Sequence, residues 1–84
     1  MNLKEFDLVE VNGNSFIILN VIESNSNRYL YLVNKDKEDD LAIVKVIEEN
    51  GKVEFIAIDN DEEFELVLKK LVIANKEEIK KFYE

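Results

Sequence analysis

Two Asn-Gly pairs, Asn12–Gly13 and Asn50–Gly51, constrain the fold of this chain more than any other feature of its sequence. Both residues of such a pair tolerate a positive φ, which the type I′ turn of a two-residue β-hairpin requires. Each pair lies between apolar runs of strand length, so both predict strand-to-strand turns. The stretch SNSN, Ser24–Asn27, also has turn chemistry, because Asn and Ser side chains hydrogen-bond to the nearby backbone. The stretch NKDKEDD, Asn34–Asp40, predicts a charged loop.

The runs between these turns are rich in β-branched and aromatic residues and alternate in polarity over parts of their length. They predict five strands, at Phe6–Val11, Phe16–Glu23, Arg28–Val33, Leu41–Glu48 and Lys52–Ile58. The central strands are apolar on both faces, which a sheet with one solvated face does not require. We therefore expect either a strongly curled sheet or a second face that is covered by the helix or by another chain. An uncovered face or an unpaired edge strand would favour a homodimer.

The hydrophobic period changes from two to 3.6 in the stretch DNDEEFELVLKKL, Asp59–Leu71. An amphipathic helix is predicted there, because apolar residues recur at helical spacing. The predicted stripe consists of Phe64, Val67, Leu68, Leu71 and Val72. Phe64 opens the stripe and is expected to anchor the helix to the sheet.

Residues with capping chemistry flank this helix. Asp59 or Asn60 can cap its first turn. Asn75, with Glu78 three residues later, resembles a second cap, and a short second stripe follows it: Ile79, Phe82 and Tyr83. The sequence thus predicts a single small α+β domain over residues 1–84. Its architecture is an antiparallel β-meander of four to five strands, with a C-terminal helix, one bent or two short, packed on one face.

The composition excludes several kinds of chemistry. Cysteine and histidine are both missing from the sequence, so it offers no thiolate and lacks the commonest general base and transition-metal ligand. The net charge is −8, without the basic stripe of a nucleic-acid binder, so we expect no direct nucleic-acid binding and no attraction to anionic membranes. The N-terminus lacks the apolar core of a signal peptide, and no apolar run is long enough to span a membrane. A cytoplasmic protein is expected.

Acidic residues gather in two groups, which are the candidate sites. The first group lies at the predicted helix start: Asp59, Asp61, Glu62, Glu63 and Glu65. The second lies in the charged loop: Asp36, Glu38, Asp39 and Asp40. Neither matches an EF-hand loop, which needs glycine at its sixth position and glutamate at its twelfth. No phosphate-binding glycine motif or nucleophile elbow is present either. We predict no metal, no cofactor and no catalytic residue.

The residues support a non-enzymatic module that binds a basic protein surface through these two acidic groups. At the helix start the carboxylates should spread around the helix end, with Glu62, Glu63 and Glu65 in solvent. The alternative is an inhibitor that mimics nucleic acid, of the kind that phages direct against host defence nucleases or other DNA- or RNA-binding enzymes. A small hydrolase with paired carboxylates is a third class. Tyr29 and Tyr31 suit half-buried strand positions better than an RNA-stacking platform.

One long stretch, FIILNVIESNSNRYLYLVNKDKEDDLAIVKVIEENGKVEFIAIDNDEEFELVLKKL, resembles the YrzB-like family of small acidic bacterial proteins, a domain of unknown function. The shared motifs are the YLYLV strand, the acidic loop, the AIVKV strand and the IDNDEEFELV entry into the last helix. The resemblance covers residues 16–71, and the tail NKEEIKKFYE departs from it. It implies the same fold and a bacterial cytosolic setting, and it supplies no activity.

Overall fold

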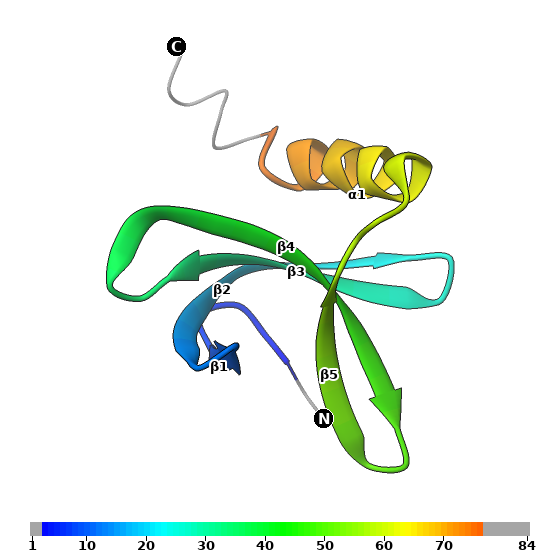
Figure 1. The fold of residues 1–84 in the computed structure, drawn as a ribbon. Coiled ribbons are helices and arrows are strands. Elements are labelled where there is room, and N and C mark those ends of the chain that lie inside the picture. The colour runs from blue at the N-terminus through cyan, green and yellow to red at the C-terminus, as the bar shows by residue number, and fades with distance from the viewer. Residues whose placement is uncertain (1–2, 77–84) are drawn as a thin grey trace, which may run out of the picture.

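A computed structural model describes residues 3–76, which contain five strands and one helix (Figure 1). These elements are β1 (Leu8–Val11), β2 (Asn14–Ser24), β3 (Asn27–Asn34), β4 (Lys37–Glu49), β5 (Lys52–Ala57) and α1 (Asp61–Ala74). The strands lie in the sheet in chain order, and each is antiparallel to its neighbour. The meander curls into a nearly closed barrel, and α1 lies across its outside. The predicted α+β meander is confirmed.

The tight turns follow the chemistry of the sequence. Asn12 and Gly13 have φ of 51° and 81°, and Asn50 and Gly51 have φ of 52° and 79°. The link between β2 and β3 also has two residues with positive φ, at 51° and 67°, although neither is glycine. Consecutive residues with positive φ give the turn the twist that matches two antiparallel strands. The turns predicted at these three places are confirmed.

The charged loop that we predicted over residues 34–40 is wrong in extent, because β4 already begins at Lys37. An irregularity in β4, between the pairs Val33–Leu41 and Asn34–Lys37, leaves a turn of two residues. Asn34 organises this turn although it is buried: its Oδ1 accepts a hydrogen bond from the Asp36 backbone N–H at 2.9 Å, and its Nδ2 donates to Asp40 Oδ2 at 3.1 Å. With both ends of the amide bonded, burying Asn34 leaves no polar atom unsatisfied.

The interior of the barrel is the larger of two apolar clusters. Its buried members come from four strands: Val9, Phe16, Ile18, Leu30, Leu32 and Val44. Three of these side chains, Ile18, Leu30 and Leu32, are fully buried. The alternation of β3 puts Leu30 and Leu32 inside, whereas Tyr29 and Tyr31 point to the outer face.

The second cluster lies between α1 and the outer face of the sheet. Ile22, Tyr29, Val67 and Leu71 form it, and Tyr31, Ile43 and Ile58 pack against it. The helix of the same chain therefore covers the central part of the second apolar face. Our expectation that Phe64 anchors the helix is wrong, because Phe64 is 39% exposed and Val72 is exposed as well. The helix is rotated so that Val67 and Leu71 face the sheet.

The C-terminal end of the predicted helical region is only partly described. Asn75 is the C-cap of α1, and its backbone N–H donates to the Leu71 carbonyl at 3.2 Å. The second stripe predicted at Ile79, Phe82 and Tyr83 lies outside the described residues.

The first strand begins at Leu8 rather than Phe6, because Phe6 has a φ of 71° and belongs to a turn. In residues 3–76 no helix is long and apolar enough to cross a membrane.

Two leucine truncations in α1 test this rotation of the helix. Leu71→Ala should lower the free energy of unfolding by about 2–5 kcal/mol, because it leaves a cavity between helix and sheet. Leu68→Ala removes the same atoms from a side chain that is 42% exposed, and should cost less than about 1 kcal/mol. Urea denaturation measures both values. Equal losses for the two variants would contradict the observed orientation of the helix.

Candidate functional site

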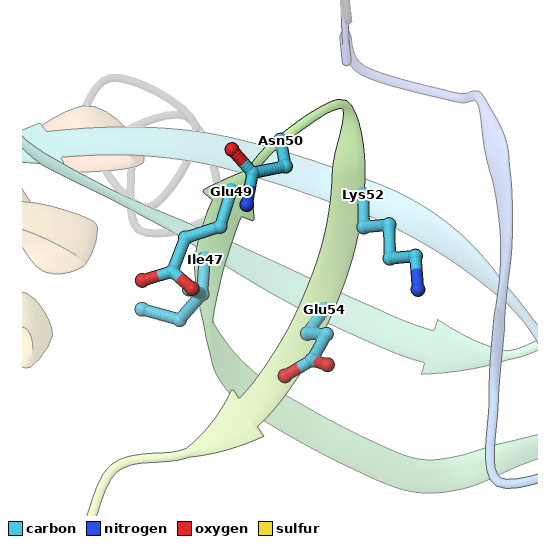
Figure 2. Close-up of a pocket in the computed structure, with 5 residues that line it drawn as sticks. All are labelled: Ile47, Glu49, Asn50, Lys52 and Glu54. Atoms are coloured by element: carbon cyan, nitrogen blue, oxygen red, sulfur yellow. The ribbon is translucent and has the colours of Figure 1, made fainter.

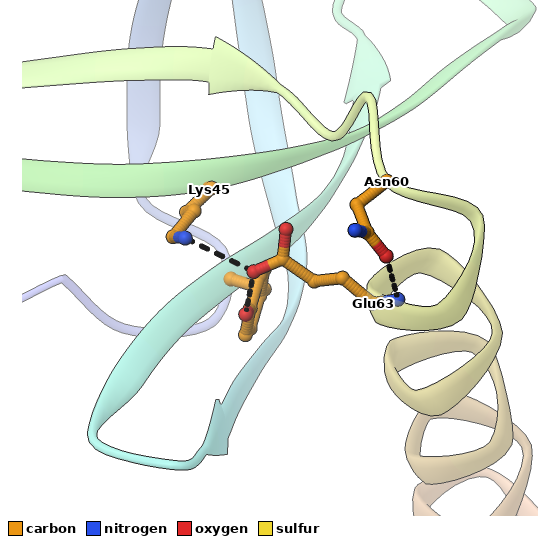
Figure 3. Close-up of polar contacts among 4 residues, drawn as sticks. Lys45, Asn60 and Glu63 are labelled. Atoms are coloured by element: carbon orange, nitrogen blue, oxygen red, sulfur yellow. Dashed lines mark hydrogen bonds and ion pairs between the residues drawn. The ribbon is translucent and has the colours of Figure 1, made fainter.

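The acidic residues at the start of α1 form a capped helix end. Asn60 is the N-cap: its Oδ1 accepts a hydrogen bond from the backbone N–H of Glu63 at 2.9 Å (Figure 3). Asp61, Glu62 and Glu63 lie in the first turn. Negative charge is favourable there, because the N–H groups of the first turn and the helix dipole present partial positive charge. The predicted cap and acidic first turn are confirmed.

Glu63 is turned toward the sheet. Our expectation that it lies in solvent is therefore wrong. Its Oε2 accepts hydrogen bonds from the Tyr29 hydroxyl at 2.5 Å and from Lys45 Nζ at 3.0 Å, and the Lys45 contact is visible in Figure 3. The reason is its position on the helix: Glu63, Val67 and Leu71 are spaced four residues apart and share the sheet-facing side. Glu63 therefore joins the start of α1 to β3 and β4.

The ionisation of this cluster follows from its contacts. The hydrogen bond from Tyr29 and then that from Lys45 lower the pKa of Glu63 below its ordinary value of 4.5. Burial, followed by the hydrogen bond to Glu63 and its negative charge, raises the pKa of Tyr29 above 10.0. At neutral pH Glu63 is therefore a carboxylate and Tyr29 a neutral phenol. The hydrogen bonds that the Glu63 carboxylate accepts join the start of the helix to the sheet.

The remaining acids of the helix start face outward. Asp59, Asp61, Glu62 and Glu65 are all exposed, as we expected for Glu62 and Glu65. The side chains of Asp61, Glu62 and Glu65 spread around the end of the helix, because successive helical residues are about 100° apart, and Asp59 lies just before the N-cap. This arrangement produces a broad negative surface, which we call the helix-start acids: Asp59, Asp61, Glu62 and Glu65.

The second acidic group lies at the other end of β3. Asp36, Glu38, Asp39 and Asp40 are exposed in the β3–β4 hairpin, and Asp40 is bonded to Asn34. Tyr29, beside the helix start, is near the beginning of β3, whereas Asn34 is its last residue. Figure 1 shows the β3–β4 hairpin and the start of α1 on opposite sides of the molecule. The structure therefore does not bring the two predicted groups together.

A concave site that we did not predict lies on the β4–β5 hairpin. It has a volume of about 250 Å³ and is lined by Ile47, Glu49, Asn50, Lys52 and Glu54 (Figure 2). In Figure 2 the carboxylates of Glu49 and Glu54 lie on the side of Ile47, whereas the Lys52 side chain extends away from them. The two-residue Asn-Gly turn could have revealed this neighbourhood, because it sets the register that pairs Ile47 with Glu54 and Glu49 with Lys52.

The acidic side chains that the structure describes do not gather around a common point. Within residues 3–76, no three acidic side chains converge on a point that could hold a metal ion. The carboxylates of Glu49 and Glu54 at the β4–β5 hairpin are exposed.

A curled five-stranded antiparallel meander with one covering helix makes this chain a small α+β domain. The chain belongs to the DUF1292 family, described as a protein of unknown function, whose model matches residues 7–71. This range includes all five strands and most of α1. The resemblance noted in the sequence covered residues 16–71, and the family match extends this range toward the N-terminus, to residue 7. No curated protein and no solved structure matches the chain.

The pKa of Glu63 predicts an acid-sensitive contact. A carboxyl whose pKa is lower in the folded chain than in the unfolded chain stabilises the fold above its unfolded pKa, and this contribution is lost as the pH falls through the folded pKa. Glu63→Gln should therefore reduce the loss of stability between about pH 6 and about pH 3.

Urea denaturation at a series of pH values measures this effect. Glu62→Gln removes an exposed carboxyl from the same turn and is the matched control, which should retain the wild-type pH dependence. If Glu63→Gln and Glu62→Gln give the same pH dependence, the bonds from Tyr29 and Lys45 do not hold Glu63 in solution.

Proposed function

We propose that this domain is a non-enzymatic cytoplasmic interaction module that binds a basic surface of another protein through its helix-start acids. The observation that carries the proposal is that one acid of the helix start is bonded to the sheet and the other four are exposed. Glu63 is bonded to Lys45 and Tyr29, whereas Asp59, Asp61, Glu62 and Glu65 are exposed beside it. One carboxylate thus fixes the helix end, and its neighbours are available to a partner.

The helix start is favoured over the β3–β4 hairpin because apolar surface adjoins it. Phe64, Leu68 and Val72 are exposed and lie four residues apart along one flank of α1. An apolar centre with a charged rim is the usual composition of a protein interface. The acids would speed the encounter with a basic partner, and the apolar flank would add contact area once the partner has docked.

Charge reversal at the helix start tests this proposal. Glu62→Lys with Glu65→Lys should leave the fold intact, because exposed charges add little to stability. It should weaken partner binding by about tenfold or more at low salt, a difference that shrinks as the Debye length falls below about 8 Å. The partner is first captured from the native host and identified, and affinity is then measured by titration calorimetry at several salt concentrations.

Glu38→Lys with Asp39→Lys is the matched control, because it reverses the same amount of charge in the β3–β4 hairpin. Affinity close to wild type in this control assigns binding to the helix start. Unchanged binding by Glu62→Lys with Glu65→Lys at low salt would refute the proposal. The nucleic-acid mimic is the alternative, and duplex DNA separates the two: a mimic's target would release this protein as DNA is added.

The proposal also entails a lack of turnover. Purified protein incubated with phosphoester, glycoside, peptide and ester substrates should release product no faster than buffer. An activity that a single Asp or Glu substitution abolishes would identify the domain as an enzyme instead.

A further inference from the structure

The barrel has an opening between its first and last strands. Among the described residues β1 is paired with β2 alone and β5 with β4 alone, so each has one free edge. A concavity of about 320 Å³ lies between them, lined by Glu10 and Val11 of β1 and by residues 53–56 of β5. A free strand edge presents unpaired backbone N–H and C=O groups, which can form a ladder with another extended chain.

The topology makes both free edges suitable for the same added strand. Each strand of the meander is antiparallel to the next, so in a series of five the first and last have the same direction around the barrel. One extended segment can therefore run antiparallel to β5 and to β1. Such a segment would continue the antiparallel order of the barrel.

The side chains that border the opening differ between its two sides. On the interior side, Val11 of β1 and Phe55 of β5 pack against the barrel cluster and are half-buried, and Val53 of β5 is half-buried too. On the outer side, Glu10 and Glu54 are exposed, one on each strand, and Ile56 beside Glu54 is exposed as well. A segment in the opening would meet apolar surface with the residues on its inner side, and the two carboxylates with residues on its outer side.

We propose that this opening binds an extended segment of a partner protein in which apolar and basic residues alternate, added as a strand to the free edge of β5. The basic residues complement Glu10 and Glu54, and the backbone supplies the ladder. A second copy of this chain is disfavoured as the occupant, because each copy carries a net charge of −8. This surface is separate from the helix-start acids and does not depend on the function proposed for them.

A synthetic peptide tests the proposal directly. The probe is a capped seven-residue peptide with lysine at odd and valine at even positions, about 23 Å long when extended. Titrated against the full chain at low salt, it should bind and slow amide hydrogen exchange in β5. Two further versions are N-methylated at every second residue, in opposite phases, which removes backbone donors and keeps the side chains. At least one of the two methylated peptides should bind about tenfold more weakly than the unmodified peptide.

Paired charge reversals separate this edge from the acidic helix. Glu10→Lys with Glu54→Lys should weaken the unmodified peptide by about tenfold, whereas Glu62→Lys with Glu65→Lys should change its affinity by less than about threefold. If both pairs weaken binding equally, or if both methylated peptides bind as well as the parent, the peptide is held as a polycation and the proposal is wrong. An absence of binding at about 1 mM peptide also refutes it.

Discussion

Burial of both faces of β3 is the constraint on which the rest of this structure depends. Leu30 and Leu32 point into the barrel, and Tyr29 and Tyr31 point under α1. A strand that is apolar on both faces is stable only when both are covered. Curling of the sheet covers one face, and the helix covers the other. The barrel and the helix are thus coupled through a single strand, although the chain has only 84 residues in which to build a core.

A bulge in β2 allows this strand to place side chains in both apolar clusters. The pairing with β3 shifts between Ile18 and Asn20, which places one extra residue in β2. Ile18 belongs to the barrel cluster and Ile22 to the cluster under the helix, although residues four apart in a regular strand share a face. The extra residue reverses the alternation, so that one strand contributes to both clusters. The run FIILNVI does not reveal this reversal, because it is apolar at nearly every position.

Glu63 connects this packing to the surface chemistry. Its bonds to Tyr29 and Lys45 hold the helix end against β3 and β4, and they direct one carboxylate of the acidic stretch inward. The other carboxylates face outward as a consequence of the helical period. The exposed negative surface is therefore placed by the same contact that positions the helix. That surface is separate from the open edge of the barrel and from the acidic β3–β4 hairpin.

The sequence by itself determined three of the four hairpin turns, the number of strands and the existence of α1, because positive φ at Asn-Gly pairs, alternation and helix capping are local properties. It could not decide which side of α1 meets the sheet. Apolar residues lie on several sides of this helix, so its periodicity allows both Phe64 and Val67 as the anchor. Contact with Ile22 and Tyr29 selected Val67. The partner of Glu63 and the opening between β1 and β5 likewise follow from pairings between distant residues, which only the tertiary structure establishes.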